Sequence, residues 1–263
     1  MKTLLLYWAS YKFLLVVVGF HLVLFLVCLV LIPFDKTQIL GISRWIKPAK
    51  FALSIVVYLM TMAYLLSFFP ASHWGRAQNY AFWFALLMLL VIICITIQAL
   101  RGQPSHFNIT SGFNIFIFNV MGLAILINTL MLVLLTIDFF VLPLEMPTDL
   151  RWAVRLGLGL MLLGSAEAGL MLRLQQHAVG VMDGGAGLPF LNWSTEGGDL
   201  RIAHFVGLHA LQILISLVWL NAWFQFFTTD FAKIAGVCMA SLLILGLFVV
   251  TAWQALAGKP LWH

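Results

Sequence analysis

The chain has 263 residues, of which 63% are hydrophobic and 9% charged, and its formal net charge is +5. A soluble domain carries about a quarter charged residues, so this composition excludes an ordinary soluble protein and indicates an integral membrane protein. The apolar segments are too long and uniform for the strands of a membrane β-barrel, and no loop is long enough to form a soluble domain. We therefore expect an all-α fold that forms a single transmembrane domain over residues 1–263.

Seven apolar segments have the ~20 residues that a helix needs to cross the hydrocarbon core of a bilayer. Proline or glycine lies near most of their boundaries, where these residues interrupt helices. The sequence predicts a bundle of seven transmembrane helices, and the last two are the least clearly separated. In chain order, the expected spans are 11–32, 48–69, 79–100, 111–137, 151–173, 201–227 and 232–256.

Three polar motifs fall at span ends that face the same side of the membrane. They are WIKPAKFALS (45–54), ALRGQPSHFN (99–108) and the segment 188–212, which leads into the sixth span. Polar groups inside a bilayer must be satisfied or functional, so the motifs predict that one face of the protein is chemically specialised. Lysine and arginine are slightly more numerous on this side, which favours an N-terminus outside the cell.

A buried acid and a buried histidine are the first candidates for a site. Glu167 lies six residues deeper in its span than Arg173, and His209 lies eight residues deeper than Arg201. At the rise of a helix, these side chains are about 9 and 12 Å below the face that carries the three motifs. Consecutive helices usually neighbour one another, so we expect the two side chains to meet in a polar pocket. The alternatives are a carboxyl bonded to a neighbouring helix and a neutral core histidine.

A close approach of helices is expected near this acid. Ser165 and Gly169 are four residues apart on the fifth span, and small residues at this spacing let membrane helices pack closely. We therefore expect the fifth span to pack closely against a neighbouring helix along this small-residue stretch, LGSAEAGLML (163–172).

A metal site in this chain must draw its ligands from several helices. His204 and His209 are five residues apart and project in different directions, so they cannot form a local two-histidine clip. The set His106, Glu167 and His209 remains, either as ligands of a divalent metal or as catalytic acid–base groups. A haem held by His21 and His209 is less favoured, because these histidines lie at different depths.

Polar and basic side chains near the ends of the spans are expected to bind a substrate. Asp199 is expected to cap the sixth span, and the basic groups could hold a phosphate, a carboxylate or a lipid head group. The alternatives are basic side chains that snorkel to the interface, and an Asp199–Arg201 pair that orders its loop. The expected substrate-binding residues are Lys47, Lys50, Arg101, Asn108, Asp199, Arg201 and Gln212.

WIKPAKFALS, RGQPSHFN and NWSTEGGDLRIAHFVGLHALQ, in this order, resemble a family of uncharacterised seven-span membrane proteins from bacteria. The resemblance covers most of the chain. It implies a helical protein of the bacterial inner membrane, but brings no activity, substrate or catalytic residue.

The predicted polar pocket indicates an intramembrane enzyme, metal-dependent or redox, that acts on a lipid-like or anionic small molecule. One alternative is a proton-coupled transporter of a small anion. Another is a ligand-binding sensor or an assembly subunit. Seven spans do not divide into two repeats, which favours the enzyme over the transporter. We expect contact with the lipid bilayer and no nucleic-acid partner.

Overall fold

The computed structural model describes residues 11–261. Within this range, seven helices are long and apolar enough to cross a membrane, so the chain is an integral membrane protein of the all-α class. The expected seven-helix fold is confirmed. The helices are α2 (Lys12–Phe34), α3 (Ile46–Leu66), α4 (Trp74–Leu100), α5 (Gly112–Val141), α6 (Thr148–Leu174), α7 (Leu200–Phe224) and α8 (Asp230–Leu256).

Short elements occupy the connections between helices. Two antiparallel pairs are present in the described part of the chain, β1 (Gln38–Ile39) with β2 (Ile42–Ser43), and β3 (Ala178–Val179) with β4 (Gly198–Asp199). A 3-10 helix, η1 (Ala71–His73), leads directly into α4. α4 therefore begins before the expected residue 79, because the polar interfacial residues that precede it continue the helix.

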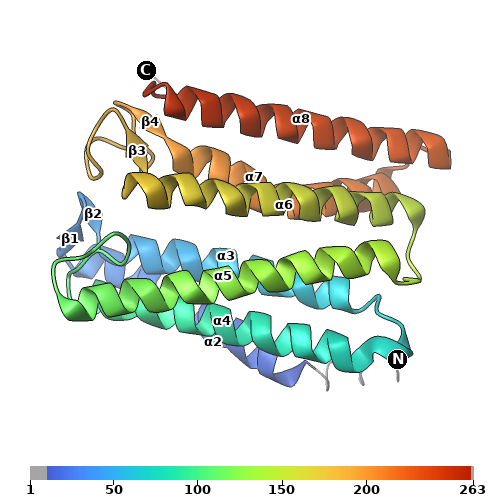
Figure 1. Ribbon diagram of the computed structural model, residues 1–263, viewed down its shortest axis with the longest axis horizontal. Helices are drawn as coiled ribbons and strands as arrows, with labels where there is room; N and C mark the ends of the chain where they lie inside the picture. The colour runs from blue at the N-terminus through green and yellow to red at the C-terminus, as the bar shows by residue number, and fades with distance from the viewer. Residues whose placement is uncertain (1–10, 262–263) are drawn as a thin grey trace. The chain divides into compact units, whose positions relative to one another are not determined.

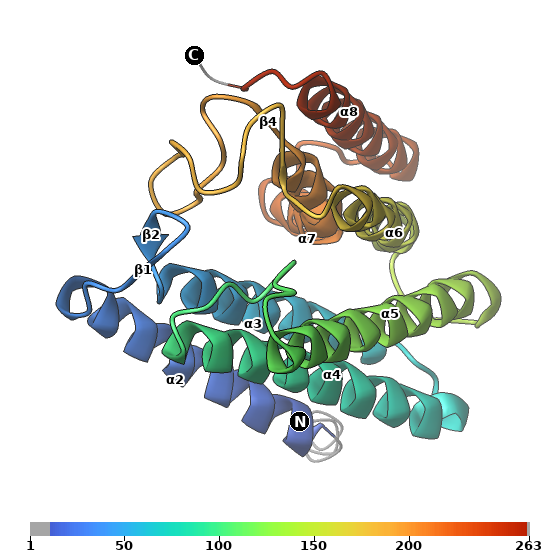
Figure 2. The same ribbon diagram turned by 60° about the vertical axis from the view of Figure 1, so that its left-hand side comes forward.

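Contacts divide the chain into two compact units, and the boundary between residues 131 and 132 falls inside α5. In the N-terminal unit, α2, α3 and α4 pack on one another (Figure 1). In the C-terminal unit, α6, α7 and α8 do the same, and Figure 2 shows these three helices nearly end on. Sequential helices are thus neighbours within each unit, as short connections favour.

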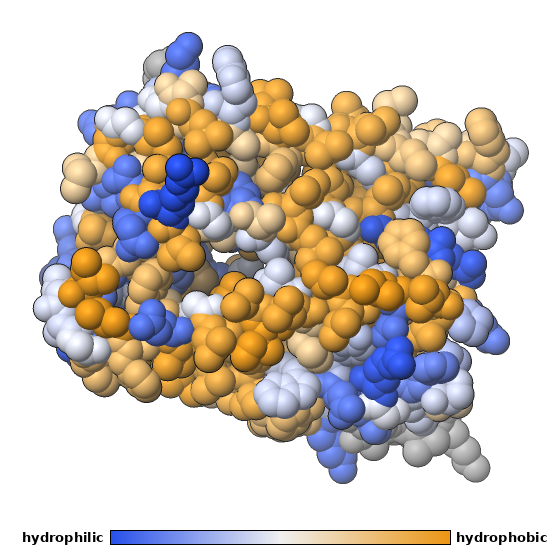
Figure 3. Space-filling view, in the orientation of Figure 1, coloured by the Kyte–Doolittle hydropathy of each residue, from blue (hydrophilic) through white to orange (hydrophobic). Residues whose placement is uncertain are grey.

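The outer faces of the helices are apolar, as a lipid environment requires. Large aliphatic side chains stay exposed along α2 and α8, including Val23 at 61% and Leu243 at 67%. Figure 3 shows apolar side chains along the helices and hydrophilic ones gathered toward the helix ends. Such faces would be unstable in water but are matched to hydrocarbon, so the bilayer contact is a property of the whole fold.

In the C-terminal unit, α6 and α7 approach each other closely at glycines. A Cβ atom added to Gly164 would lie 2.8 Å from the carbonyl carbon of Gly207, and one added to Gly157 would lie 2.7 Å from the Cα of Leu211. The close approach expected along LGSAEAGLML is confirmed at Gly164, whereas a Cβ on Gly169 would meet nothing within 4 Å. Gly157 and Gly164 are two helical turns apart and share one face of α6.

The loop between α6 and α7 rests on α8 through a second glycine contact. A Cβ on Gly198, in β4, would collide with the carbonyl oxygen of Ala255 near the end of α8, and one on Gly197 would lie 2.8 Å from the carbonyl oxygen of Val179. Only glycine fits both positions. Gly198 therefore lets this loop pack against the last helix, and Gly197 lets it pack against its own strand β3.

Candidate functional site

The expected site residues fall into two polar clusters, one in each unit. Those of the N-terminal unit lie at the start of α3 and in the segment after α4, and those of the C-terminal unit lie on α6, α7 and the loop between them. The first cluster contains Lys47, Lys50, Arg101, His106 and Asn108, and the second contains Glu167, Asp199, Arg201, His209 and Gln212.

A network of buried amides joins the end of α4 to the start of α5. Nη1 of Arg101 donates to Oε1 of Gln98 at 2.5 Å and to Oδ1 of Asn114 at 2.7 Å. Nε2 of Gln98 donates to the same Asn114 oxygen at 3.0 Å. Gln98 and Asn114 are buried, so these bonds satisfy polar groups that would otherwise be costly in this interior.

Asn108 organises the loop that carries this network. Its Oδ1 accepts from the backbone N–H of Thr110 at 3.2 Å and from the Thr110 hydroxyl at 2.7 Å. Its Nδ2 donates to the carbonyl oxygen of Pro104 at 3.2 Å, and Asn114 donates to its Oδ1 at 3.3 Å. These bonds give Asn108 an internal structural role, while its expected role in substrate binding stays a prediction.

Lys47 and His106 form a contact across the same cluster. Nζ of Lys47 lies 3.1 Å from Nδ1 of His106, and the Ser105 hydroxyl lies 3.0 Å from the same nitrogen. An ammonium group can only donate, so this nitrogen is an acceptor and the ring proton belongs on Nε2. Lys50 is half-buried one turn further along α3. The Lys47–His106 pair thus orients the imidazole of an expected catalytic residue.

Arg44 and Asp35 form an ion pair that fixes the connection between α2 and α3. Oδ2 of Asp35 accepts from Nε of Arg44 at 2.6 Å and from the indole N–H of Trp45 at 2.8 Å. The backbone N–H of Thr37, together with the Trp45 indole and Arg44, holds the pKa of Asp35 well below its usual range. Arg44 also donates to the carbonyl oxygen of Leu100 at the end of α4.

Charge is distributed unevenly along the chain. Residues 1–131 contain eight lysine and arginine residues but only one carboxylate, Asp35, and that carboxylate is held by Arg44. Residues 132–263 contain six basic residues and eight acidic ones. The N-terminal unit is therefore strongly cationic, and most of its basic side chains have no carboxylate within their own unit.

The C-terminal unit holds a buried acid beside a histidine. Oε2 of Glu167 lies 3.5 Å from Nδ1 of His204, and the side chains are 3% and 26% exposed, respectively. Nδ1 of His204 lies 2.7 Å from the carbonyl oxygen of Gly164, which can only accept, so this nitrogen carries a proton. Neither carboxyl oxygen of Glu167 has a hydrogen bond to any described residue.

The glycine crossing explains why Glu167 and His204 meet. Gly164 and Glu167 are three residues apart on α6, and His204 and Gly207 are three apart on α7, so each pair shares a helix face. The two helices are antiparallel, so the contact of Gly164 with Gly207 places Glu167 next to His204, one turn away. Sequence reasoning missed His204 as a site residue, although this matched three-residue spacing is its signal.

The other two expected residues of α7 make different contacts. The ring of His209 lies 4.3 Å from the ring of Phe205 and has no hydrogen bond to the described residues. If its amide oxygen and nitrogen are exchanged, Gln212 donates to the carbonyl oxygens of Leu208 and His209 at 3.2 and 3.3 Å. The structure thus pairs Glu167 with His204, and the roles expected for His209 and Gln212 stay predictions.

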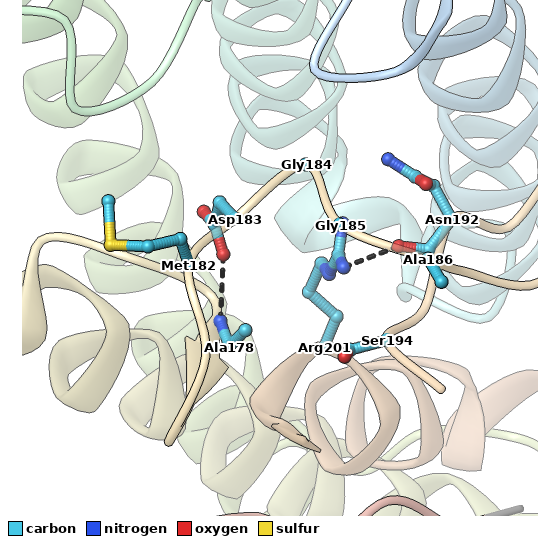
Figure 4. A pocket seen from close by; sticks show the side chains of 9 residues that line it. All are labelled: Ala178, Met182, Asp183, Gly184, Gly185, Ala186, Asn192, Ser194 and Arg201. Carbon is cyan, nitrogen blue, oxygen red and sulfur yellow. Dashed lines mark hydrogen bonds between the residues drawn. The ribbon is translucent and has the colours of Figure 1, made fainter. Parts of the chain in front are cut away.

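Asp199 is the N-cap of α7, as its position predicts. Its Oδ1 accepts from the backbone N–H of Arg201 at 3.0 Å, and its Oδ2 accepts from the backbone N–H of Ser194 at 2.7 Å. The Arg201 side chain binds both carboxylate oxygens. It also donates to the carbonyl oxygen of Asn192 (Figure 4). These contacts match the alternative in which Asp199 and Arg201 order the loop. A role for the pair in substrate binding stays untested.

A small pocket lies in this loop, lined in part by Asp183, Asn192, Ser194 and Arg201 (Figure 4). Its free volume of about 10 Å³ is enough for roughly one water molecule. Burial raises the pKa of Asp183, but hydrogen bonds from His177 and from two backbone N–H groups outweigh this effect and lower it to about 2. Asp183 is therefore a structural carboxylate.

The loop should lose stability in acid because of Asp183. A carboxylate with a lowered pKa stabilises the fold above its ordinary value of 3.8, and this contribution disappears as the pH falls toward 2. We expect Asp183→Asn to cost about 2 kcal/mol at pH 7. Hydrogen exchange of the amides of His177 and Ala178, measured in both proteins across this pH range, reports the effect. Equal exchange at pH 7 would contradict it.

The described residues contain no group of three or more His, Cys, Asp or Glu side chains that could hold a metal ion. The set of His106, Glu167 and His209 has members in both units, and it stays a prediction.

No protein-family model matches the chain, and no curated protein or solved structure is similar to it.

Proposed function

We propose that the protein is a proton-coupled carrier of a small anion, in which Glu167 and His204 bind and release the proton. The observation that carries this proposal is the buried carboxyl group of Glu167. It has no hydrogen bond among the described residues and lies 3.5 Å from His204. Ionisable groups inside membrane spans most often mark ion or proton pathways.

The geometry supports a proton relay through the imidazole. A buried carboxylate needs a donor or a cation beside it, and Nδ1 of His204 is the nearest basic atom. His204 is more exposed than Glu167, so a proton from outside can reach its Nε2 first. The ring is then cationic, and its Nδ1 proton can pass to Glu167. This step leaves a neutral carboxyl group and a neutral ring in the other tautomer.

The charge of the N-terminal unit supports an anion as the cargo. Its basic residues outnumber its carboxylates by eight to one, so the unit attracts anions and disfavours cations. A proton that moves together with an anion also reduces the net charge that must cross the bilayer. Our proposal includes a location in the bacterial inner membrane, which the motif resemblance implies and where a proton gradient can drive uptake.

Metal chemistry is less well supported at Glu167. A catalytic metal typically needs three protein ligands, and the described His, Cys, Asp and Glu residues form no such group. The closest basic neighbour of Glu167 is a single histidine. This arrangement favours proton exchange over metal binding, so the carrier is preferred to the metal-dependent enzyme.

Infrared difference spectroscopy of the purified protein tests the proton site directly. Between alkaline and acidic buffer, we expect a band from a protonated carboxyl group that Glu167→Gln removes and that His204→Gln alters. Glu145→Gln is the matched control, because Glu145 is exposed. In liposomes that contain a pH-sensitive dye, a phosphate or chloride gradient should move protons only with intact Glu167. Wild-type proton movement in Glu167→Gln would refute the proposal.

A further inference from the structure

The guanidinium of Arg101 is fixed from one side only. Its Nη1 is clamped by the buried amides of Gln98 and Asn114, and its central carbon lies 4.4 Å from the centre of the Phe113 ring. Its Nε and Nη2 find no acceptor among residues 11–261. These two groups form the edge with which an arginine donates two parallel hydrogen bonds to an oxyanion.

Within the N-terminal unit, no carboxylate compensates the charge of Arg101. The sole acidic residue there is Asp35, which is occupied by Arg44 and Trp45. The carbonyl oxygens of Ala99 and Leu100, at the negative end of α4, accept from Arg44 instead. Arg101 thus presents a positive charge and two free donors that are left for a ligand.

This arrangement differs from that of a snorkelling arginine. A snorkelling side chain keeps its head group free in water while its stem covers apolar surface. Arg101 instead gives up rotamer freedom to bind two buried amides, which is entropically costly. The clamp holds the remaining edge in one orientation, as a binding site requires.

The surroundings of Arg101 suit a ligand that carries both charge and hydrocarbon. Leu100 precedes it in the chain and the Phe113 ring packs against its guanidinium, and these side chains are 57% and 47% exposed. Arg101 directly follows α4, where the chain leaves the apolar span. A phosphate at the level of the lipid head groups would therefore meet the free edge with acyl chains beside it.

We propose that Arg101 binds a phosphate group through its Nε and Nη2, from either a phospholipid head group or free phosphate. The inference rests on the proposed function only for what the anion does there, because the binding itself follows from Arg101 alone. Free phosphate would be a candidate for the cargo. A phospholipid would be a bound cofactor of the fold.

The test measures the thermal stability of the full chain in a neutral detergent. One arm adds short-chain phosphatidylglycerol, and the other adds sodium phosphate against sodium chloride at equal ionic strength. A ligand that binds the native state raises the Tm in proportion to its affinity. We expect Arg101→Gln to weaken binding about ten- to hundredfold. Lys36→Gln is the matched control, because Lys36 is an exposed cation in the same unit.

The outcomes of this experiment identify the ligand or refute the site. A shift with lipid alone identifies a head-group site, and a shift with phosphate alone identifies a soluble anion. If neither ligand raises the Tm, or if Arg101→Gln binds as the wild type does, the site is refuted. Arg101→Lys keeps the charge but loses the paired Nε and Nη2 donors. If Arg101→Gln does not fold, weaker ligand binding by Arg101→Lys tests the site in its place. Glu145→Gln, at an exposed acid outside both sites, should bind as the wild type does. The readout is ligand binding and not proton movement, so failure of this site is distinguishable from failure of the proton pair.

Discussion

Replacing Gly164 by alanine is expected to lower the free energy of unfolding by about 1–3 kcal/mol. The added methyl group would lie 2.8 Å from two backbone atoms of α7, in Gly207 and Leu208, and backbone atoms cannot move aside as a flexible side chain can. The helices must separate, and His204 and Glu167 lie one turn away. We therefore expect the infrared band of Glu167 to change in the same variant. Unfolding in mixed detergent micelles gives the stability.

Gly159→Ala is the matched control for this substitution. Gly159 lies on the same helix, and a Cβ there would meet nothing within 4 Å. Since alanine favours a helix over glycine, this variant should be unchanged or up to about 1 kcal/mol more stable. Equal destabilisation by the two substitutions would mean that the crossing of α6 and α7 is not as close as described.

Replacing Asp199 by alanine is expected to cost about 2–3 kcal/mol, less than a fully buried ion pair because Arg201 is partly exposed. The variant loses the cap of α7, leaves the charge of Arg201 without its carboxylate, and leaves the N–H of Ser194 without its acceptor. The loop over 175–199 should then open, which limited proteolysis detects. Thermal unfolding measures the loss of stability.

Two further variants separate the parts played by Asp199. Asp199→Asn keeps a capping oxygen but loses the charge, so its effect should lie between those of the wild type and Asp199→Ala. Asp230→Ala removes the exposed acid of the first turn of α8, which lies 3.8 Å from Lys233, and should cost no more than about 0.5 kcal/mol. Similar losses for Asp199→Ala and Asp230→Ala would argue against a special role for the Asp199–Arg201 pair.

The helices could be predicted from sequence because a bilayer imposes one length and one composition on them. Each expected span falls on an observed helix, and the differences lie at the helix ends, the largest of them at the start of α4. The cap at Asp199 could also be predicted, since its signal is local. Both predictions use signals that lie within one short stretch of sequence.

The partner of Glu167 could not be predicted from depth alone. Counting residues from the helix ends favours His209, but the register of α6 against α7 is set where Gly164 meets Gly207. Which of several glycines faces a neighbouring helix depends on how both helices are rotated, and composition does not reveal this. A difference of about one turn therefore decided which histidine lies beside the acid.

The expected substrate-binding residues show a second limit of sequence reasoning. A polar side chain at the end of a span can bind a ligand, or it can form hydrogen bonds with the backbone of its own loop. Its residue type is the same in both cases. Asp199 and Arg201 are occupied by their loop, while Arg101 keeps two free donors. Only the geometry separates these cases.

The contact between Gly198 and the end of α8 has a consequence for the order in which the protein assembles. The ribosome makes the loop over 175–199 more than fifty residues before Ala255, the residue on which Gly198 rests. This loop therefore lacks its packing contact with α8 until the last helix has entered the membrane. Packing of Gly198 against Ala255 is then one of the last events of biogenesis, and the last helix to be made completes the packing of a segment made well before it.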